Sequence, residues 1–341
     1  MENNLTKYHL MFLLIISLAS YISIYYYRKI ALNIKLLDTP NGRSSHSEPT
    51  PNGAGIVFGL GFFLFLIGYY FRVSTYPMYV FLGGVGSVVI SLVGLLDDRF
   101  GLTIKKRLVV QVGVSASIMF SILIYSETSL LLLVIKFLVF VLLIVSSINI
   151  YNFMDGINGL AGFQGLFYFS SGAFIFYWYD ASLLMFSSLF ISSMLLGFLC
   201  WNFPKAKVFM GDGGSGTLGL LVAFFAVGGF YEHKIPLYLW LIPSGIFWFD
   251  GTITILRRMV RGETWYEAHK IHAYQRLHHR VGWSHSRIVL FSILINIILF
   301  GFLLGAICYP SYDLVFLFLT FILLAISYFL VEIKAPFADS T

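Results

Sequence analysis

Long apolar runs alternate with polar connectors along almost the whole chain. A helix needs about 20 apolar residues to cross the hydrocarbon core of a bilayer, and about eleven runs approach that length. They cover approximately residues 8–27, 54–71, 77–96, 108–125, 130–148, 159–178, 182–200, 216–231, 235–256, 288–308 and 313–332. The pattern predicts an all-α fold, a polytopic membrane bundle of about eleven transmembrane helices.

The polar connectors form two sets that alternate along the chain. One set is very short, and the other is longer and carries 18 of the 22 Lys and Arg residues. Connectors rich in Lys and Arg are retained on the cytoplasmic side of a membrane. The distribution therefore predicts that the longer connectors are cytoplasmic, with the N-terminus outside and the C-terminus inside.

Composition supports a membrane protein with a single domain. The 341 residues are 58% hydrophobic and only 11% charged, which excludes an ordinary soluble domain. The cysteines, Cys200 and Cys308, lie in apolar runs and suggest neither a disulfide framework nor a zinc site. The first run is too long for a secretory signal, so we expect it to be retained. Without an internal repeat or linker, residues 1–341 are expected to form one domain.

The longer connectors hold most of the candidate chemistry. The first, residues 36–55, is dense in Pro, Gly and Ser. It is either a plain turn-rich linker or a functional segment, for which Asp38, Arg43 and His46 are the candidate residues. The second places Asp97 and Asp98 directly after an apolar run, with Lys105 and Arg107 following. These acids are either solvated at a helix end or held as a pair near a cation or phosphate group.

The third connector, NIYNFMDGINGLAG at residues 149–162, lies between two apolar runs that can each span a bilayer. Asn152, Asp155 and Asn158 give it amides and a carboxylate, and its glycines permit backbone conformations closed to other residues. A connector that only turned the chain would need none of these polar groups. We therefore expect it to form one wall of a polar site.

The fourth connector, FPKAKVFMGDGGSGTLG, surrounds Asp212 with glycines. A helix starting near Ser215 to Thr217 would present free N–H groups that attract phosphate, and Gly211 would let the backbone approach a ligand. Asp212 is a hard oxygen ligand suited to Mg²⁺. The spacing is not that of a Walker loop, and a glycine-rich helix entry without function is the alternative.

The fifth connector, residues 257–287, is the longest and contains AHKIHAYQRLHHRVGWSH. His269 and His272 are three residues apart and would share a helix face. Zinc binding and contact with anionic lipid head groups are two interpretations. A third, favoured by the neighbouring Gln275 and basic residues, is that the histidines hold phosphates.

One carboxylate, Asp250, falls inside the ninth apolar run. An ionisable residue within a membrane span is a candidate functional residue and is expected to face the bundle interior. Pro243 and Gly245 in the same run predict a bend or break in the helix, which would open a lateral groove.

Taken together, the connectors resemble those of the polyprenyl-phosphate N-acetylhexosamine-1-phosphate transferases, integral membrane enzymes that begin bacterial cell-envelope glycan synthesis. The resemblance is collinear from about Asp38 to His285. Its parts are DTPNGRSSHSEPTP, GLLDDRFGL with RLVVQ after it, NFMDGINGLAG, FMGDGGSG, the FDGT…RR pair and HKIHAYQRL…GWSH. Each part is weak alone, but six in one order on one predicted membrane side are a strong signal.

The resemblance implies catalytic roles for two groups of residues. Asp97 and Asp98 match an acidic pair beside the polyprenyl phosphate and metal, and Asp155 matches a residue near the diphosphate. His269 and His272 match a histidine motif that contacts the diphosphate. The metal ligand, by the same resemblance, is Asp212, with Mg²⁺ as the expected ion and Mn²⁺ as the alternative.

The resemblance also implies substrate-binding residues. Phe209 matches a ring that stacks on uracil, Asn152 lies near the nucleotide, and Arg107 stands where relatives carry a basic residue facing the phosphates. Asn158 departs from the family, because many relatives have an aspartate that contacts uracil there. The remaining expected binding residues are Lys105, Gly211, Ser215 and Gln275.

The implied reaction transfers a sugar 1-phosphate from a UDP-N-acetylhexosamine to undecaprenyl phosphate and releases UMP. The expected location is the bacterial inner membrane, with the active site on its cytoplasmic face, no nucleic-acid partner, and a homodimer as in relatives. The histidine motif resembles O-antigen and capsule initiators more than the muramoyl-pentapeptide translocase. The alternative function is a multi-span transporter or flippase, which would place its polar residues near the membrane midplane.

Overall fold

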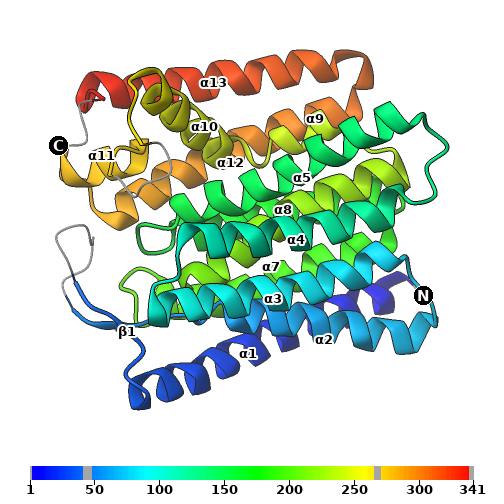
Figure 1. Cartoon of the computed structure of the whole chain (residues 1–341), viewed down its shortest axis with the longest axis horizontal. Coiled ribbons are helices and arrows are strands. Elements are labelled where there is room, and N and C mark those ends of the chain that lie inside the picture. Colours follow the sequence, from blue (N-terminus) through cyan, green and yellow to red (C-terminus); the bar gives the residue numbers. More distant parts are fainter. Residues whose placement is uncertain (1, 41–47, 265–269, 338–341) are drawn as a thin grey trace.

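The computed structural model describes residues 2–40, 48–264 and 270–337. His269, one of the expected catalytic residues, lies outside these ranges, as do Arg43 and His46 of the first connector. The described chain is a bundle of long helices with one small two-stranded sheet. The long helices lie side by side along the longest axis of the molecule (Figure 1).

The first seven long helices follow the apolar runs closely. Helix bounds differ from the predicted runs mainly because polar ends extend the helices beyond their apolar cores. These helices are α1 (Glu2–Asn33), α2 (Ile56–Val73), α3 (Met78–Phe100), α4 (Ile104–Leu123), α5 (Leu130–Phe153), α6 (Leu160–Trp178) and α7 (Ser182–Asn202).

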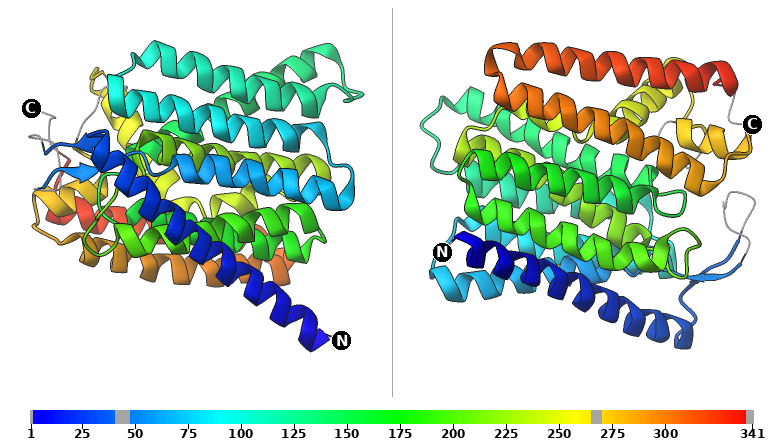
Figure 2. Two further views of the ribbon diagram at one scale, coloured as in Figure 1. Left: turned by 90° about the horizontal axis from the view of Figure 1, so that it is seen from below. Right: turned by 180° about the vertical axis from the view of Figure 1, so that it is seen from behind.

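The second half of the chain is more interrupted. A 3-10 turn, η1 (Pro310–Tyr312), joins the last two long helices. The helices here are α8 (Gly211–His233), α9 (Leu237–Leu241), α10 (Gly245–Val260), α11 (Ala273–His279), α12 (His285–Cys308) and α13 (Asp313–Lys334). Figure 2 shows α1 crossing its neighbours at an angle, with the other long helices behind it.

Within the described residues, nine helices are long and apolar enough to cross a membrane. The all-α membrane class is therefore confirmed, while the count of eleven spans stays a prediction. Helix α6 is not among the nine, and the ninth predicted run forms the two shorter helices α9 and α10. The orientation of the two termini likewise stays a prediction.

The expected break in the ninth run is present between Leu241 and Gly245. A helix break frees backbone carbonyls, and a freed carbonyl away from water needs a hydrogen-bond donor. Gln164 Nε2 donates to the carbonyl of Pro243 at 2.9 Å, and Asn296 Nδ2 donates to Gln164 Oε1 at 3.0 Å. These buried amides stabilise the interrupted backbone inside the bundle.

Helix α8 is the central helix of the bundle and packs against α3 and α5. A Cβ on Gly94 of α3 would lie 2.1 Å from the backbone nitrogen of Gly213, so the two helices approach as closely as glycine allows. The sequence prediction that this helix starts near Ser215 is wrong, because α8 begins at Gly211. Close packing of glycines at this contact outweighs their low helix propensity.

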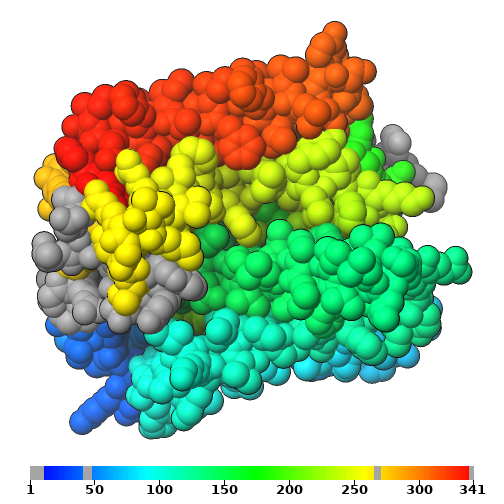
Figure 3. All heavy atoms as spheres, turned by 45° about the horizontal axis from the view of Figure 1, so that its top comes forward, coloured from blue at the N-terminus to red at the C-terminus, as the bar shows by residue number. Residues whose placement is uncertain are grey.

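The connectors that carry the candidate residues gather at one end of the bundle, which we call the polar end. It contains the antiparallel strands β1 (Leu37–Asp38) and β2 (Thr50–Pro51), helix α11, and residues 154–159 and 203–210. Figure 1 shows β1 and α11 at this end. In the space-filling view, α13, α10, α5 and α4 follow one another across one face (Figure 3).

Candidate active site

A cavity of about 540 Å³ opens at the polar end. Its volume is in the range of small-molecule binding sites. The lining comes from five connectors or helix ends that are distant in sequence. It comprises Leu36, Leu37, Asp38, Thr39, Asn52, Asp98, Asn152, Asp155, Gly156, Ile157, Asn158, Asn202, Phe209, Gly211, Asp212, Ser215, Gln275 and His279.

The adjacent acids Asp97 and Asp98 have different surroundings. Consecutive residues of a helix point in different directions, and only Asp98 lines the cavity. Asp97 accepts hydrogen bonds from the Leu102 amide at 2.6 Å and from Arg107 Nη1 at 2.5 Å. Asp97 is therefore held by the protein itself, and Asp98 is the member of the pair available to a ligand.

One oxygen of Asp98 has no donor in the part of the chain that the structure describes. Asp98 Oδ1 accepts from Asn52 Nδ2 at 3.0 Å and from the Asp212 amide at 3.3 Å. Asp98 Oδ2 is buried without a hydrogen-bond partner among the described residues. A Cβ on Gly211, whose φ is +70°, would lie 2.2 Å from this oxygen. Glycine is therefore required where the backbone passes the carboxylate.

Asp212 lies in the first turn of α8 and is held from two sides. Asn152 Nδ2 donates to Asp212 Oδ1 at 2.9 Å, and Arg107 Nη1 is 3.0 Å from Asp212 Oδ2. Asn152 Nδ2 also reaches the hydroxyl of Ser215 at 3.0 Å. Arg107 thus joins Asp97 to Asp212 and fixes the geometry of the acidic cluster.

Negative charge exceeds positive charge at this site. Burial raises the pKa of Asp155 well above its ordinary value, and the charges of Asp212 and Asp98 raise this pKa further. The positive charge of Arg107 is paired with Asp97 and Asp212. Carboxylates gathered in this way favour binding of a cation.

The donor set fits Mg²⁺ better than zinc. No group of three or more His, Cys, Asp and Glu within the described ranges is arranged to hold a metal by itself. Mg²⁺ sites of nucleotide enzymes use one or two carboxylates together with substrate phosphates. Asp98 Oδ2, which lacks a donor, and the nearby Asp212 match that requirement in number and chemistry.

The first connector is part of the site, so the plain-linker interpretation is wrong. The amides of Ala54 and Gly55 donate to the carbonyls of Phe209 and Met210 at 3.1 and 2.8 Å, and the Phe209 amide donates to Pro51 at 2.8 Å. These bonds fix the Phe209 backbone beside the cavity, which the residue lines. The first and fourth connectors therefore form one unit.

The third connector forms a wall of the cavity, as predicted. Asn158 Nδ2 donates to the carbonyl of Pro204 at 3.3 Å, and the backbone N–H of Asn158 donates to His285 Nδ1 at 3.3 Å. The amide of Gly159 donates to Asn202 Oδ1 at 2.7 Å. This network links the third connector to the fourth and the fifth.

The fifth connector differs most from expectation. The sequence predicts that His272 lies on a helix face. His272 instead lies just before the first residue of α11. The His272 side chain is 1% exposed and lies beside Asp250, and it does not line the cavity. Gln275 and His279 of α11 do line it. Burial lowers the pKa of His279, and the neighbouring His278 and Lys270 lower it further.

The lining residues that were absent from the predicted site include Asn52, Asn202 and His279. Asn52 and His279 lie inside the motifs TPNGAG and QRLHH, so their signal was present but not assigned. Asn202 is the first polar residue after an apolar run and carried no separate signal. Conversely, Lys105 is exposed on the first turn of α4 and does not line the cavity.

A second, smaller cavity of about 30 Å³ borders the same acidic cluster. It lies among α3, α4, α5 and α8, and it shares Asn152 and Asp212 with the larger cavity. Arg107 and Gln111 are polar residues of α4 that line it, beside apolar residues of α3 and α5. Asp212 therefore separates a large polar cavity from a small one between membrane-spanning helices.

Comparison with known proteins gives a consistent family. Residues 80–230 match the model of glycosyl transferase family 4. The chain is 30% identical over 320 residues to the probable undecaprenyl-phosphate N-acetylglucosaminyl 1-phosphate transferase of Bacillus subtilis (strain 168), covering 90% of this chain and 86% of the relative. It is 30% identical to the decaprenyl-phosphate N-acetylglucosaminephosphotransferase of Mycobacterium leprae (strain TN), covering 80% of this chain and 77% of the relative.

A third relative, from Thermotoga maritima, is undecaprenyl-phosphate alpha-N-acetylglucosaminyl 1-phosphate transferase. The two chains are 28% identical over 270 residues, which cover 79% of this chain and 82% of the relative. The similarity in all three cases spans most of both chains. The residues that match the family model, 80–230, include Asp98, Asp155 and Asp212 of the cavity.

Proposed function

Because this chain belongs to glycosyl transferase family 4, we propose that it transfers an N-acetylhexosamine 1-phosphate from a UDP-sugar to undecaprenyl phosphate and releases UMP. The observation that carries the proposal is the position of Asp98, Asp155 and Asp212 around one cavity at the ends of membrane-spanning helices. A water-soluble donor and a membrane-bound acceptor can both reach a site at that position.

The larger cavity suits the UDP-sugar. Its lining is mainly polar, and it holds Phe209 for stacking on the base and Asn158 for hydrogen bonds to it. The smaller cavity among α3, α4, α5 and α8 suits the acceptor phosphate, because Arg107 and Gln111 supply a charge and a hydrogen-bonding amide between apolar walls. Asp212, which borders both cavities, lies where donor and acceptor phosphates would meet.

In the proposed reaction an oxygen of undecaprenyl phosphate attacks the phosphorus that carries the sugar. A new P–O bond forms, the P–O bond to UMP breaks, and UMP leaves with the bonding electron pair. A phosphate monoester has a second pKa of about 6, so the acceptor is mostly dianionic at pH 7. A carboxylate base adds little to such a nucleophile. We therefore assign Asp97 and Asp98 to positioning rather than to proton removal.

Asp212 and Asp98 would hold the Mg²⁺ ion, which, when bound, offsets the negative charge of the diphosphate and the departing UMP. Asn152 and Arg107 keep the Asp212 carboxylate in place, and Arg107 also attracts the acceptor phosphate. Asp155 completes the acidic wall. Mn²⁺ is the alternative ion, because it accepts the same oxygen ligands.

We place the enzyme in the bacterial inner membrane with the polar end in the cytoplasm, following the charge distribution of the connectors. The sugar belongs to the N-acetylhexosamine class, and the glycan is of the O-antigen or capsule type by the form of the fifth connector. The transporter alternative is less well supported, because the polar residues of the cavity lie at one end of the bundle and not at its middle.

The test is incubation of the purified protein in detergent with undecaprenyl phosphate, Mg²⁺ and a panel of UDP-N-acetylhexosamines. We expect UMP release that requires both the acceptor and the divalent ion, with one sugar preferred. A transporter would release no UMP from any of these donors. The absence of UMP with every donor, in protein that binds UDP, would contradict the proposal.

A further inference from the structure

Helix α11 contributes two residues to the cavity wall although it is only seven residues long. Gln275 and His279 are four positions apart and therefore lie on one face of the helix, and both line the cavity. Isolated helices of this length are not stable in water. Contacts with the rest of the protein must therefore hold α11, and those contacts set where Gln275 and His279 lie.

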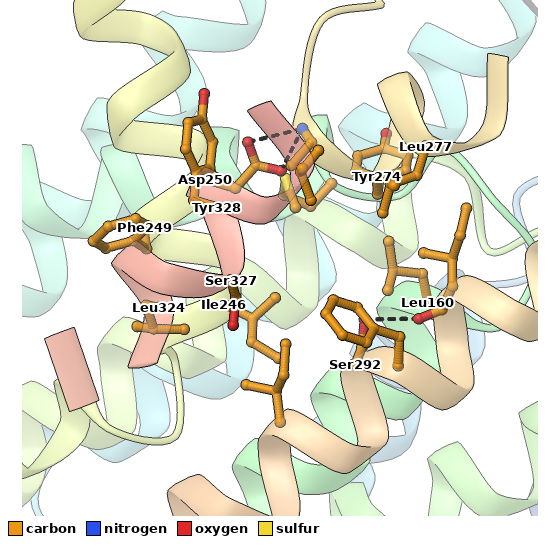
Figure 4. Close-up of a pocket in the computed structure, with 16 residues that line it drawn as sticks. Leu160, Ile246, Phe249, Asp250, Tyr274, Leu277, Ser292, Leu324, Ser327 and Tyr328 are labelled. Atoms are coloured by element: carbon orange, nitrogen blue, oxygen red, sulfur yellow. Dashed lines mark hydrogen bonds between the residues drawn. The ribbon is translucent and has the colours of Figure 1, made fainter. Parts of the chain in front are cut away.

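The first turn of α11 is held by Asp250. The amide of Ala273 donates to both carboxylate oxygens of Asp250, at 3.1 and 2.9 Å. The hydroxyl of Thr254, one turn further along α10, donates to Asp250 Oδ1 at 3.0 Å. Figure 4 shows two dashed hydrogen bonds reaching the Asp250 carboxylate, with Tyr328 and Tyr274 nearby. Asp250 is 6% exposed, so these bonds are made away from solvent.

His272 belongs to the same anchor. Its Nδ1 lies 3.5 Å from Asp250 Oδ1, and its side chain is almost fully buried. Its backbone amide donates to Gln275 Oε1 at 3.2 Å, which closes the first turn of α11. His272 thus faces α10, whereas Gln275 and His279 face the cavity.

Two further bonds fix the rest of α11. The Tyr274 hydroxyl donates to the carbonyl of Phe153 at 2.9 Å, just before Asp155 in the third connector. Arg276, which is fully buried, donates to Glu332 at 2.8 Å and to the Ala335 carbonyl at 2.6 Å. Helix α11 is therefore attached to α10, α13 and the third connector.

From this arrangement we propose that Asp250 is a positioning residue for the UDP-sugar half of the site. Asp250 and His272 hold the first turn of α11, and this places Gln275 and His279 against the bound donor. His272 acts within this anchor and does not touch the substrate. The inference rests on the proposed function, because it assigns the larger cavity to the UDP-sugar.

The test compares the variants Asp250→Ala, Asp250→Asn, His272→Ala and His279→Ala in the UMP-release assay. For Asp250→Ala we expect KM for the UDP-sugar to rise about tenfold, the scale of a lost hydrogen bond to a charged group, with KM for undecaprenyl phosphate unchanged. Asp250→Asn keeps one oxygen for Ala273 and is expected to recover part of the loss. His279→Ala should raise the same KM directly.

The double variant Asp250→Ala with His279→Ala gives the sharpest result. If Asp250 acts through α11, the two effects on KM for the UDP-sugar are not additive, because the second change removes a contact already displaced. Additive effects, or equal changes in both KM values, would overturn the proposal. If Asp250→Ala does not fold, Asp250→Asn and Thr254→Val weaken the same anchor and carry the same predictions on a smaller scale.

This outcome is separable from failure of the proposed function. A wild-type protein that releases no UMP contradicts the transferase itself. A wild-type protein that is active, with Asp250 variants that retain the normal KM for the UDP-sugar, contradicts only the positioning role. A His272→Ala variant that loses turnover while its KM values and its Asp250 coupling are unaffected would show that His272 touches the reacting groups.

Discussion

Asp250 is buried, Asp98 is half-buried with one buried carboxylate oxygen, and the protein surrounds these two acids near the polar end differently. Asp250 accepts hydrogen bonds at both oxygens from Ala273 and a further one from Thr254. Asp98 accepts both of its bonds at Oδ1 and has a buried Oδ2 without a donor among the described residues. It also lies near two other acids of the cavity.

The difference indicates that Asp250 has a structural role, whereas Asp98 has an oxygen available to bind a ligand. A buried charge is stabilised when hydrogen bonds satisfy it, and it is destabilising when they do not. Asp250 therefore stabilises the fold. The charge of Asp98 is satisfied only when the protein binds a ligand such as a cation. The predictions that follow test this distinction, in order of decreasing expected effect.

The largest effect is expected for Asp212→Asn. An asparagine keeps an oxygen for Asn152 and the shape of the side chain but removes the charge that would hold the cation. We expect the rate of UMP release to fall by about a thousandfold, because stabilisation of charge on the diphosphate is lost. The measurement is UMP release at saturating substrates and Mg²⁺, with insertion and folding checked by size-exclusion chromatography.

Asp180→Asn is the matched control for Asp212→Asn. Asp180 is exposed in the connector between α6 and α7, away from the polar end, and its φ of +54° suits asparagine. This variant should retain activity within about twofold, as expected for a surface substitution. Full activity in Asp212→Asn would contradict the site assignment.

The second prediction concerns stability and has opposite signs for the two carboxylates. In protein stripped of divalent ions, Asp98→Asn should be more stable than wild type, because the unsatisfied charge is removed. Asp250→Asn should be less stable by about 1–3 kcal/mol, since it replaces one of the two oxygens that accept from Ala273 and removes the charge. Thermal unfolding in detergent with a chelator measures both. Activity should fall in Asp98→Asn despite its greater stability, as at other strained sites.

A loss of stability in Asp98→Asn equal to that in Asp250→Asn would contradict the comparison. Adding Mg²⁺ provides a second check within the same experiment. The ion should stabilise wild type and should have less effect on Asp98→Asn, because a ligand stabilises only the folded form that binds it.

The apolar helices could be predicted well because their signal is local. The run predicted at residues 182–200 is the helix Ser182–Asn202, and the run at 54–71 is Ile56–Val73. The start of α8 could not be predicted in this way. The segment MGDGGSG has low helix propensity and becomes helical through close packing against α3. That contact joins segments distant in sequence, so local sequence patterns do not predict it.

The candidate site shows the same limit. The acids of the predicted site and Asn152 were predicted from residue type and position, and Phe209 from the family resemblance. All of these except Asp97 line the cavity. Asn52 was missed because its partner, Asp98, is 46 residues away in sequence. Which of the histidines His272 and His279 lines the cavity depends on how α11 packs against the rest of the protein, and His279 is the one that lines it. Such pairings are set by tertiary structure.

The third prediction uses the raised pKa of Asp155. Asparagine at this position removes an ionisation that the folded protein resists. The pKa of Asp155 is higher in the folded protein than its value of about 3.9 in the unfolded chain. Well below that pH the residue is protonated in both states and does not affect stability. As the pH rises from there through the folded-state pKa, the free energy of unfolding of wild type falls. Asp155→Asn should therefore unfold at a higher temperature than wild type, with a difference that grows as the pH rises above about 4.

The metal-free protein is used for the Asp155 series so that a cation does not compensate the charge. The Asp180→Asn variant again serves as the control, and its difference from wild type should not follow the same course. A difference for Asp155→Asn that is constant with pH would show that packing, and not ionisation, is the cause.

The smallest effect is expected at Asn158, a position where the family resemblance implies an aspartate. Its side-chain amide donates to the carbonyl of Pro204 at 3.3 Å, and an aspartate would place an oxygen against that carbonyl. Asn158→Asp should therefore weaken UMP binding by a few-fold, about the scale of one lost neutral hydrogen bond. Isothermal titration with UMP measures the change directly.

Asn158→Ala distinguishes repulsion from a simple loss of contact. It removes the donor without adding a charge, so its affinity for UMP should lie between those of wild type and Asn158→Asp. Tighter binding by Asn158→Asp than by wild type would instead mean that the carboxylate contacts the base, as the family resemblance implies, and that the bond to Pro204 is dispensable. The order of the three affinities therefore decides which partner of Asn158 matters for the nucleotide.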